Sequence, residues 1–151
     1  MNEVRRLLAV LFVLVLGAGV VACGSDSDSD GDSGGSEIEG INWNLMNVAT
    51  QGAASSLPKG VDPPTVEFSD GKVDVFAGCN SGSGEAEIGD TTIEFGPIAL
   101  TRKSCGQVEN QVEFLVTRAM RSEANYEVNA DGLLVLENGS TSLVFTPEQS
   151  G

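Results

Sequence analysis

Residues 126–145 read YEVNADGLLVLENGSTSLVF and predict three β-strands in succession. Tyr126–Val128, Leu133–Leu136 and Ser142–Phe145 are rich in apolar and β-branched residues. Two turn sequences separate them, Asn129-Ala130-Asp131-Gly132 and Glu137-Asn138-Gly139-Ser140. The second turn contains an Asn-Gly pair, which supplies the positive φ angles that a tight hairpin needs. We therefore expect an antiparallel meander at the end of a β-rich domain.

The residues before the meander predict more strands and one helix. Five segments have strand character: Trp43–Val48, Thr65–Phe68, Lys72–Ala77, Glu85–Ile88 and Thr92–Phe95. From Gln107 to Arg121 the apolar residues fall on one helical stripe instead. This pattern favours a mainly β (α+β) fold, with about eight short strands in a small antiparallel β-barrel or curled sheet that one amphipathic helix covers.

The N-terminal residues have the pattern of a secretory signal peptide, residues 1–22. Met1–Arg6 contains two arginines, Leu7–Leu16 is apolar, and small residues in Gly17–Ala22 lead to Cys23. A signal-anchor helix is the alternative. The apolar stretch from Leu7 to Ala22 holds 16 residues, whereas a bilayer-spanning helix needs about 20.

Val20-Val21-Ala22-Cys23 resembles the lipobox of bacterial lipoproteins, with Val20 where leucine is commoner. The resemblance implies that the Cys23 thiol receives a diacylglyceryl group and that cleavage occurs just before it. Palmitate-like acyl chains would then hold the protein to the membrane, and stable anchoring needs two or more of them. We expect a cell-envelope location, on the outer side of the cytoplasmic membrane or on an outer membrane if one is present.

Three cysteines are an awkward number for an exported protein. If Cys23 carries lipid, Cys79 and Cys105 remain as one pair, and disulfides persist outside the cytoplasm. Two free buried thiols are the alternative. A zinc site has less support, because the chain has no histidine and no Cys-x-x-Cys motif.

The charge of the chain limits its partners. From a formal charge of −14, removal of Glu3, Arg5 and Arg6 with the signal leaves −15. Such a chain repels nucleic acid and anionic lipid, so the anchor has to be the acyl chains. Residues 23–36 hold the lipidated cysteine and a Ser/Asp/Gly-rich tether that we expect to be disordered. The folded domain then covers residues 37–147, and residues 148–151 form a tail.

Several segments in a fixed order resemble the META domain family, also called HslJ-like. They are Trp43-Asn44-Leu45, Gly78-Cys79-Asn80, Ile93-Glu94-Phe95-Gly96, Thr101-Arg102-Lys103-Ser104-Cys105, Glu113-Phe114-Leu115, Tyr126-Glu127-Val128, Leu133-Leu134-Val135-Leu136 and Leu143-Val144-Phe145. Lys103-Ser104 departs from the family, which often has Met-Ala there. The resemblance implies a small β-rich domain with one helix, common in exported bacterial lipoproteins and linked to stress, with no general enzymatic activity.

Two places invite a functional interpretation. Gly78 and Asn80, followed by Ser81–Gly84, could form a binding loop; alternatively they shape a bulge or turn beside the disulfide. Trp43 could anchor a partner, although it suits the core better. Arg102 and Lys103 could clamp an anion or simply be solvated.

The tether also fits the EF-hand loop formula. Its ligands would be the residues Asp26, Asp28, Asp30, Asp32 and Glu37. An EF-hand needs a helix on both sides of the loop, and the sequence before Asp26 leaves no room for one. We therefore expect no ordered metal site and no cofactor, with loose binding of divalent cations left open.

Catalysis has little support in the sequence. Without histidine there is no Ser-His or Cys-His dyad. We expect a monomeric, non-enzymatic module that binds an envelope protein or ligand. One alternative is an enzyme acting on envelope polymers through carboxylates such as Glu85 and Glu87, and another is a purely structural spacer.

Overall fold

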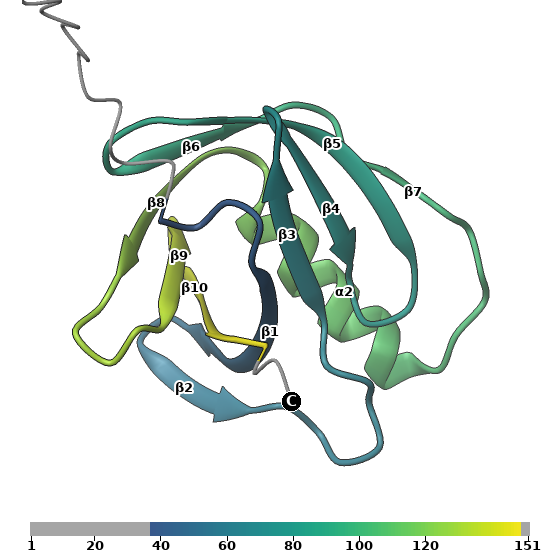
Figure 1. Ribbon diagram of the computed structural model, residues 1–151. Helices are drawn as coiled ribbons and strands as arrows, with labels where there is room; N and C mark the ends of the chain where they lie inside the picture. The colour runs from purple at the N-terminus through teal and green to yellow at the C-terminus, as the bar shows by residue number, and fades with distance from the viewer. Residues whose placement is uncertain (1–36, 149–151) are drawn as a thin grey trace, which may run out of the picture. The chain divides into compact units, whose positions relative to one another are not determined.

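The computed structural model describes residues 37–148 and contains ten strands and one helix in this part of the chain (Figure 1). In order, they are β1 Asn42–Thr50, β2 Ala53–Ser56, β3 Thr65–Ser69, β4 Lys72–Phe76, β5 Ser81–Ile88, β6 Thr92–Phe95, β7 Ala99–Leu100, α2 Gln107–Ala119, β8 Ser122–Val128, β9 Leu134–Asn138 and β10 Thr141–Pro147. No helix within these residues is long and apolar enough to span a membrane.

Eight of the strands form a closed antiparallel barrel in the order β1-β3-β4-β5-β6-β8-β9-β10. β10 closes the ring by pairing with β1 from Thr141↔Thr50 to Pro147↔Trp43. β2 and β7 lie outside the ring and pair with β1 and β5. The predicted fold class, a small antiparallel barrel with one helix, is therefore confirmed, and the C-terminal meander is β8-β9-β10.

The barrel strands alternate buried and exposed residues, as a closed sheet around one core requires. β1 shows what happens when this alternation has to change phase. Trp43 and Leu45 point inward, and so does Val48, three residues later. A bulge between Leu45 and Asn47 takes up the extra residue, so that Met46 is 40% exposed.

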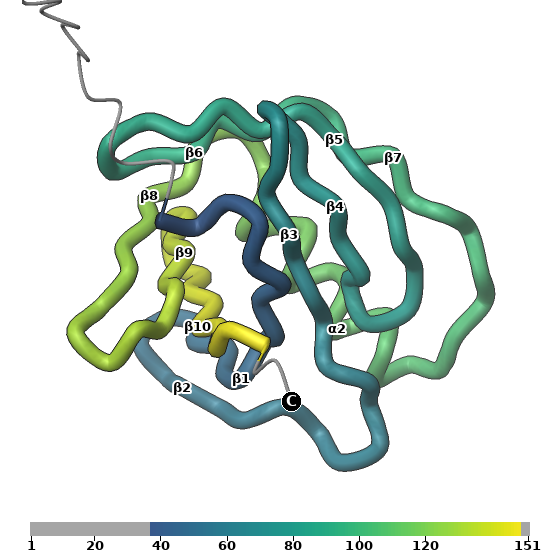
Figure 2. The backbone as a smooth tube through the Cα atoms, viewed as in Figure 1, coloured from purple at the N-terminus to yellow at the C-terminus, as the bar shows by residue number. Residues whose placement is uncertain are grey.

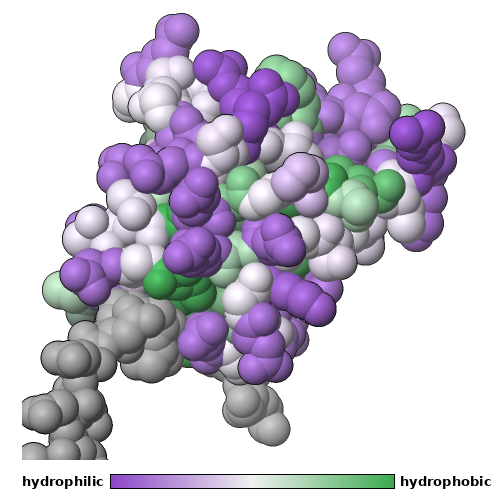
Figure 3. All heavy atoms as spheres, turned by 90° about the horizontal axis from the view of Figure 1, so that it is seen from above, coloured by the Kyte–Doolittle hydropathy of each residue, from purple (hydrophilic) through white to green (hydrophobic). Residues whose placement is uncertain are grey.

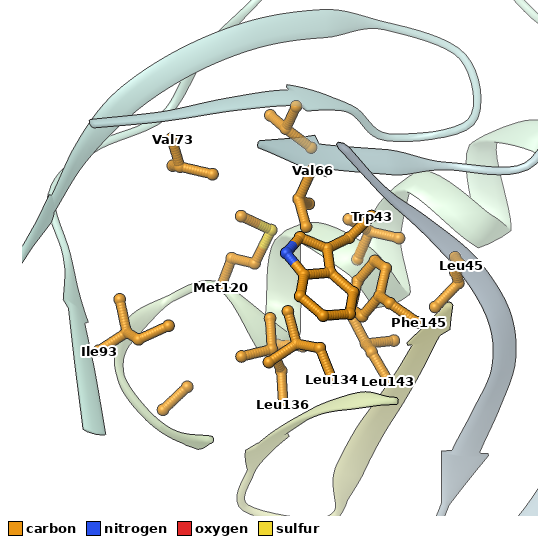
Figure 4. Packing of buried hydrophobic residues seen from close by; sticks show 14 of the residues in the cluster. Trp43, Leu45, Val66, Val73, Ile93, Met120, Leu134, Leu136, Leu143 and Phe145 are labelled. Atoms are coloured by element: carbon orange, nitrogen blue, oxygen red, sulfur yellow. The ribbon is translucent and has the colours of Figure 1, made fainter. Parts of the chain in front are cut away.

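The inside of the barrel is packed with apolar side chains. Trp43 lies in the middle of this cluster, with Val66, Met120, Leu134 and Phe145 around it (Figure 4). It is 2% exposed, so Trp43 is a core residue and not a surface anchor. The indole N–H of Trp43 donates to the backbone carbonyl of Ile38 at 3.0 Å, which satisfies its polar atom inside the core.

Helix α2 packs against the barrel with one apolar side. Val112, Val116 and Ala119 are buried, and the cap residue Met120 follows them into the core. The helix ends at Ala119, two residues before the predicted end at Arg121. The chain must turn here into β8, and Ser122 adopts a φ of 58° to do so.

The entry to the domain lies at the opposite end of β3 from the start of α2. Gly40 N–H donates to Phe68 O at 2.8 Å, beside the β3–β4 turn. At the other end of β3, Pro64 and Val112 both lie beside Gly78. Five residues of strand span about 16 Å, so β3 separates the entry segment from this part of the helix.

The structure also differs from the sequence analysis at Ser81–Gly84. These residues were considered as part of a possible binding loop, but they form the first half of β5. A Cβ on Gly82 would overlap the carbonyl oxygen of Ala99 and lie 2.9 Å from Leu100 Cα. Glycine is therefore needed because β7 passes closely over this strand, and not because the chain turns there.

Candidate functional site

The residues of the predicted Gly78–Asn80 site lie between β4 and β5, and all of them are buried. Gly78 has a φ of 103°, which favours glycine. A Cβ at this position would lie 3.0 Å from Val112 Cγ1 of α2. The turn is thus shaped to bring the backbone against the helix.

Asn80 is only 4% exposed and uses both ends of its amide. Its Oδ1 accepts from the Lys103 backbone N–H at 2.7 Å and from Thr101 Oγ1 at 2.8 Å. Its Nδ2 donates to Glu113 Oε2 at 3.0 Å, and its backbone N–H donates to the same oxygen at 2.9 Å. The amide orientation follows from these partners, because the Lys103 N–H can only donate and the carboxylate accepts.

A disulfide between Cys79 and Cys105, with Cα atoms 6.0 Å apart, completes this arrangement. We call the disulfide, Asn80, Thr101, the Lys103 backbone and Glu113 the Asn80 cluster. It ties together the β4–β5 turn, the β7–α2 connection and helix α2. Figure 2 shows that connection as it swings out from β7 and returns to the start of the helix.

A second feature is a row of exposed glutamates on the outside of the barrel. Glu87 lies directly opposite Glu94, and Glu94 lies opposite Glu123. We define the acidic wall as the exposed glutamates of neighbouring strands β5, β6, β8 and β9: Glu85, Glu87, Glu94, Glu123, Glu127 and Glu137. Figure 3 looks onto the molecule from above, where β5 and β6 lie in Figure 1, and hydrophilic side chains are spread over that face with apolar ones between them.

Comparison with known proteins identifies the family of this chain. The model of the META domain family matches residues 36–150. The chain belongs to the META domain family. No curated protein matches.

Two solved structures share the META fold with this chain. An NMR structure of a protein from Burkholderia xenovorans has a TM-score of 0.64 at 19% identity, covering 89% of this chain and 99% of that one. A second NMR structure has a TM-score of 0.58 at 18% identity, covering 74% and 92%. At this identity the likeness establishes the fold alone.

The Asn80 cluster of this META domain has its hydrogen-bonding groups turned to each other. Asn80 Oδ1 has two donors, and Nδ2 has the Glu113 carboxylate and, at 3.2 Å, the Cys79 sulfur. This arrangement favours the alternative that Gly78 and Asn80 shape a turn beside the disulfide. Among buried side-chain N and O atoms in residues 37–148, the Thr141 hydroxyl oxygen has no hydrogen-bond partner, and it lies on β10.

The acidic wall brings the predicted pair Glu85 and Glu87 together with Glu94. These three residues line a shallow hollow of about 520 Å³ with Ala86 and Phe95. All three glutamates are exposed. General acids of glycosidases instead sit in apolar pockets that favour the protonated form, so the hollow lacks the environment that this chemistry uses.

The remaining predicted metal ligands fall in two places. Glu37 is exposed at the start of the described residues. Asp26, Asp28, Asp30 and Asp32 lie outside them, as do Cys23 and the signal peptide. Within residues 37–148 there is no group of three Asp, Glu, Cys or His side chains that could hold a metal ion.

Proposed function

We propose that the mature protein is a lipid-anchored META-domain protein of the bacterial envelope that acts as a non-enzymatic binding module, with a role in stress. One observation supports the location in the envelope. The domain uses Cys79 and Cys105 in a disulfide, which leaves Cys23 of the lipobox-like sequence as the one remaining cysteine. A disulfide suits an oxidising compartment, and a lone lipobox cysteine suits lipidation.

The hydrogen bonds of the Asn80 cluster support the non-enzymatic role. The Asn80 cluster is built around one buried asparagine, whose hydrogen bonds go to a threonine, a glutamate and a backbone N–H. None of its donors is aimed at open space where a reacting atom could sit, as catalysis would require. The cluster therefore supports rigidity in the domain, and rigid barrels are suited to presenting a binding surface.

Replacing Cys23 with serine tests the anchoring. We expect the full-length Cys23→Ser protein to move from the membrane fraction to the soluble extracytoplasmic fraction, because the acyl chains are its only strong attachment to an anionic membrane. The measurement is immunoblotting of separated membrane and soluble fractions. Ser29→Ala is the matched control in the neighbouring sequence and should stay with the membrane.

Retention of Cys23→Ser in the membrane fraction after a high-salt wash would count against lipidation. It would point instead to the signal-anchor alternative, in which residues 7–22 remain attached. The Cys79–Cys105 disulfide should be present in both proteins, since it depends on export and not on lipid.

A further inference from the structure

Helix α2 presents an outward side that the barrel does not cover. Five exposed residues of the helix and Arg121, which follows its C-terminal cap, make up this α2 outer face: Gln107, Asn110, Gln111, Phe114, Arg118 and Arg121. Phe114 is 56% exposed and lies one helical turn from both Asn110 and Arg118. A large aromatic ring thus stands in water in the middle of a polar helix side, where it adds nothing to the core.

The charge of this face is opposite to that of the rest of the domain. It carries two arginines and no carboxylate, and Arg102 and Lys103 precede it in the β7–α2 connection. The two glutamates of α2 point elsewhere. Glu113 accepts hydrogen bonds from Asn80, and Glu109 lies against Gly106.

Apolar surface continues to one side of the α2 outer face. Val108 is 44% exposed. With Leu115 it lines a hollow of about 140 Å³ between the helix and the residues Leu57 and Pro58 that follow β2. An aromatic ring, arginines and an adjoining apolar hollow are the residue types enriched at the centres of protein interfaces.

We propose that the α2 outer face is the binding surface of this protein, and that its partner is an envelope protein with an apolar pocket for Phe114 and an acidic rim for Arg118 and Arg121. This inference rests on the proposed binding function and deepens it. The helix is about 20 Å long, so the contact is small and belongs with transient interfaces. Charge complementarity to Arg118 and Arg121 selects an acidic partner. The carboxylates elsewhere on the domain do not prevent this, because charge–charge interactions beyond about 8 Å are screened at physiological salt.

The charge of the protein favours a protein partner over the membrane that carries the lipid anchor. The α2 outer face belongs to a strongly acidic chain, which an extended anionic lipid surface repels. A protein can instead present carboxylates only opposite Arg118 and Arg121.

The test is site-specific crosslinking in cells with the full-length protein. A photoreactive phenylalanine derivative replaces Phe114, and the same derivative at Glu94 on the acidic wall is the matched control. We expect one protein adduct at position 114, at least tenfold above the Glu94 control. Mass spectrometry should map it to a partner segment in which apolar residues are flanked by Asp or Glu.

Charge reversal provides the second measurement. Arg118→Glu together with Arg121→Glu should lower the yield of the adduct at least tenfold, whereas Lys72→Glu, at the start of β4 and opposite Glu85 of β5, should leave it unchanged. Both variants should keep the thermal midpoint of the parent, since surface substitutions change stability little. If these variants had a lower thermal midpoint than the parent, a lower adduct yield would be explained by unfolding and not by loss of the contact.

Four results would overturn the inference: no adduct above the control, an adduct to lipid, an adduct to a second copy of this chain, or a yield that Arg118→Glu and Arg121→Glu do not change. None of them affects the fractionation of Cys23→Ser, which reports on anchoring alone. Failure of this binding surface is therefore distinguishable from failure of the proposed location.

Discussion

Removing the Cys79–Cys105 disulfide should lower the free energy of unfolding by about 3.5 kcal/mol, a large part of the stability of a small domain. The two cysteines are 26 residues apart, and opening this loop raises the conformational entropy of the unfolded chain. The loss corresponds to about 15 °C in thermal midpoint for a domain of this size. Urea unfolding of Cys79→Ala/Cys105→Ala against the parent, followed by tryptophan fluorescence of buried Trp43, measures it.

Reductant provides the matched control for this comparison. It should destabilise the parent by a similar amount and leave the double-alanine variant unchanged. If the parent in reductant lost less than about 1 kcal/mol, the bridge would not be a main support of the fold, and the Asn80 hydrogen bonds alone would have to hold the β7–α2 connection in place.

Replacing Asn80 with alanine should cost about 3–4 kcal/mol of unfolding free energy. The change removes the partners of the Lys103 N–H, the Thr101 hydroxyl and the Glu113 carboxylate at once. Each of these hydrogen bonds is part-buried and contributes about 0.5–1.5 kcal/mol net, and the one to the charged carboxylate contributes more. Asn80→Asp should be no better, because it places a second carboxylate within about 3 Å of Glu113, where like charges repel.

The matched control is Asn125→Ala, on the exposed side of β8, which should change stability by less than about 0.5 kcal/mol. A double-mutant cycle with Glu113→Ala then isolates the Asn80–Glu113 contact. We expect a coupling energy above about 1 kcal/mol. Asn80→Ala and Glu113→Ala effects that simply add would mean that the two side chains do not support each other.

The sequence predicted the barrel strands where alternation is strong and turns are well marked. Thr92–Phe95 agrees with β6 residue for residue, and the meander of β8, β9 and β10 follows from its Asn-Gly and Asp-Gly turns. β2 was missed because Ala53–Ser56 has no apolar alternation and is exposed throughout. Its strand conformation comes from pairing with β1, which local sequence cannot show.

The glycines at the start of β5 suggested a loop where the structure has a strand. Ser81–Gly84 has the composition of a loop, yet its glycines are there to let β7 approach. The same limit applies to the candidate site. The sequence placed Asn80 next to Cys79, but the essential partner Glu113 lies 33 residues away. The one weak indication in the sequence that Asn80 and Glu113 are connected was the resemblance to the META family, since Gly78-Cys79-Asn80 and Glu113-Phe114-Leu115 both belong to its pattern.

Phe114 is a candidate binding residue whose surroundings the hydrophobic periodicity of the helix does not predict. The apolar stripe of the predicted helix runs through Val108, Val112, Leu115, Val116, Ala119 and Met120 and omits this phenylalanine. An apolar residue off the stripe of an amphipathic helix faces water. That departure was visible in the sequence, but its surroundings of arginines and the adjoining hollow appear only in three dimensions.

The intact mass of the protein extracted from membranes tests the central claim most directly. The account predicts a mature chain that begins at Cys23, carries the added mass of a diacylglyceryl group, and gains two hydrogens when the Cys79–Cys105 bridge is reduced. A chain that retains residues 1–22, or that begins at Cys23 without added lipid mass, would contradict a lipid-anchored META protein.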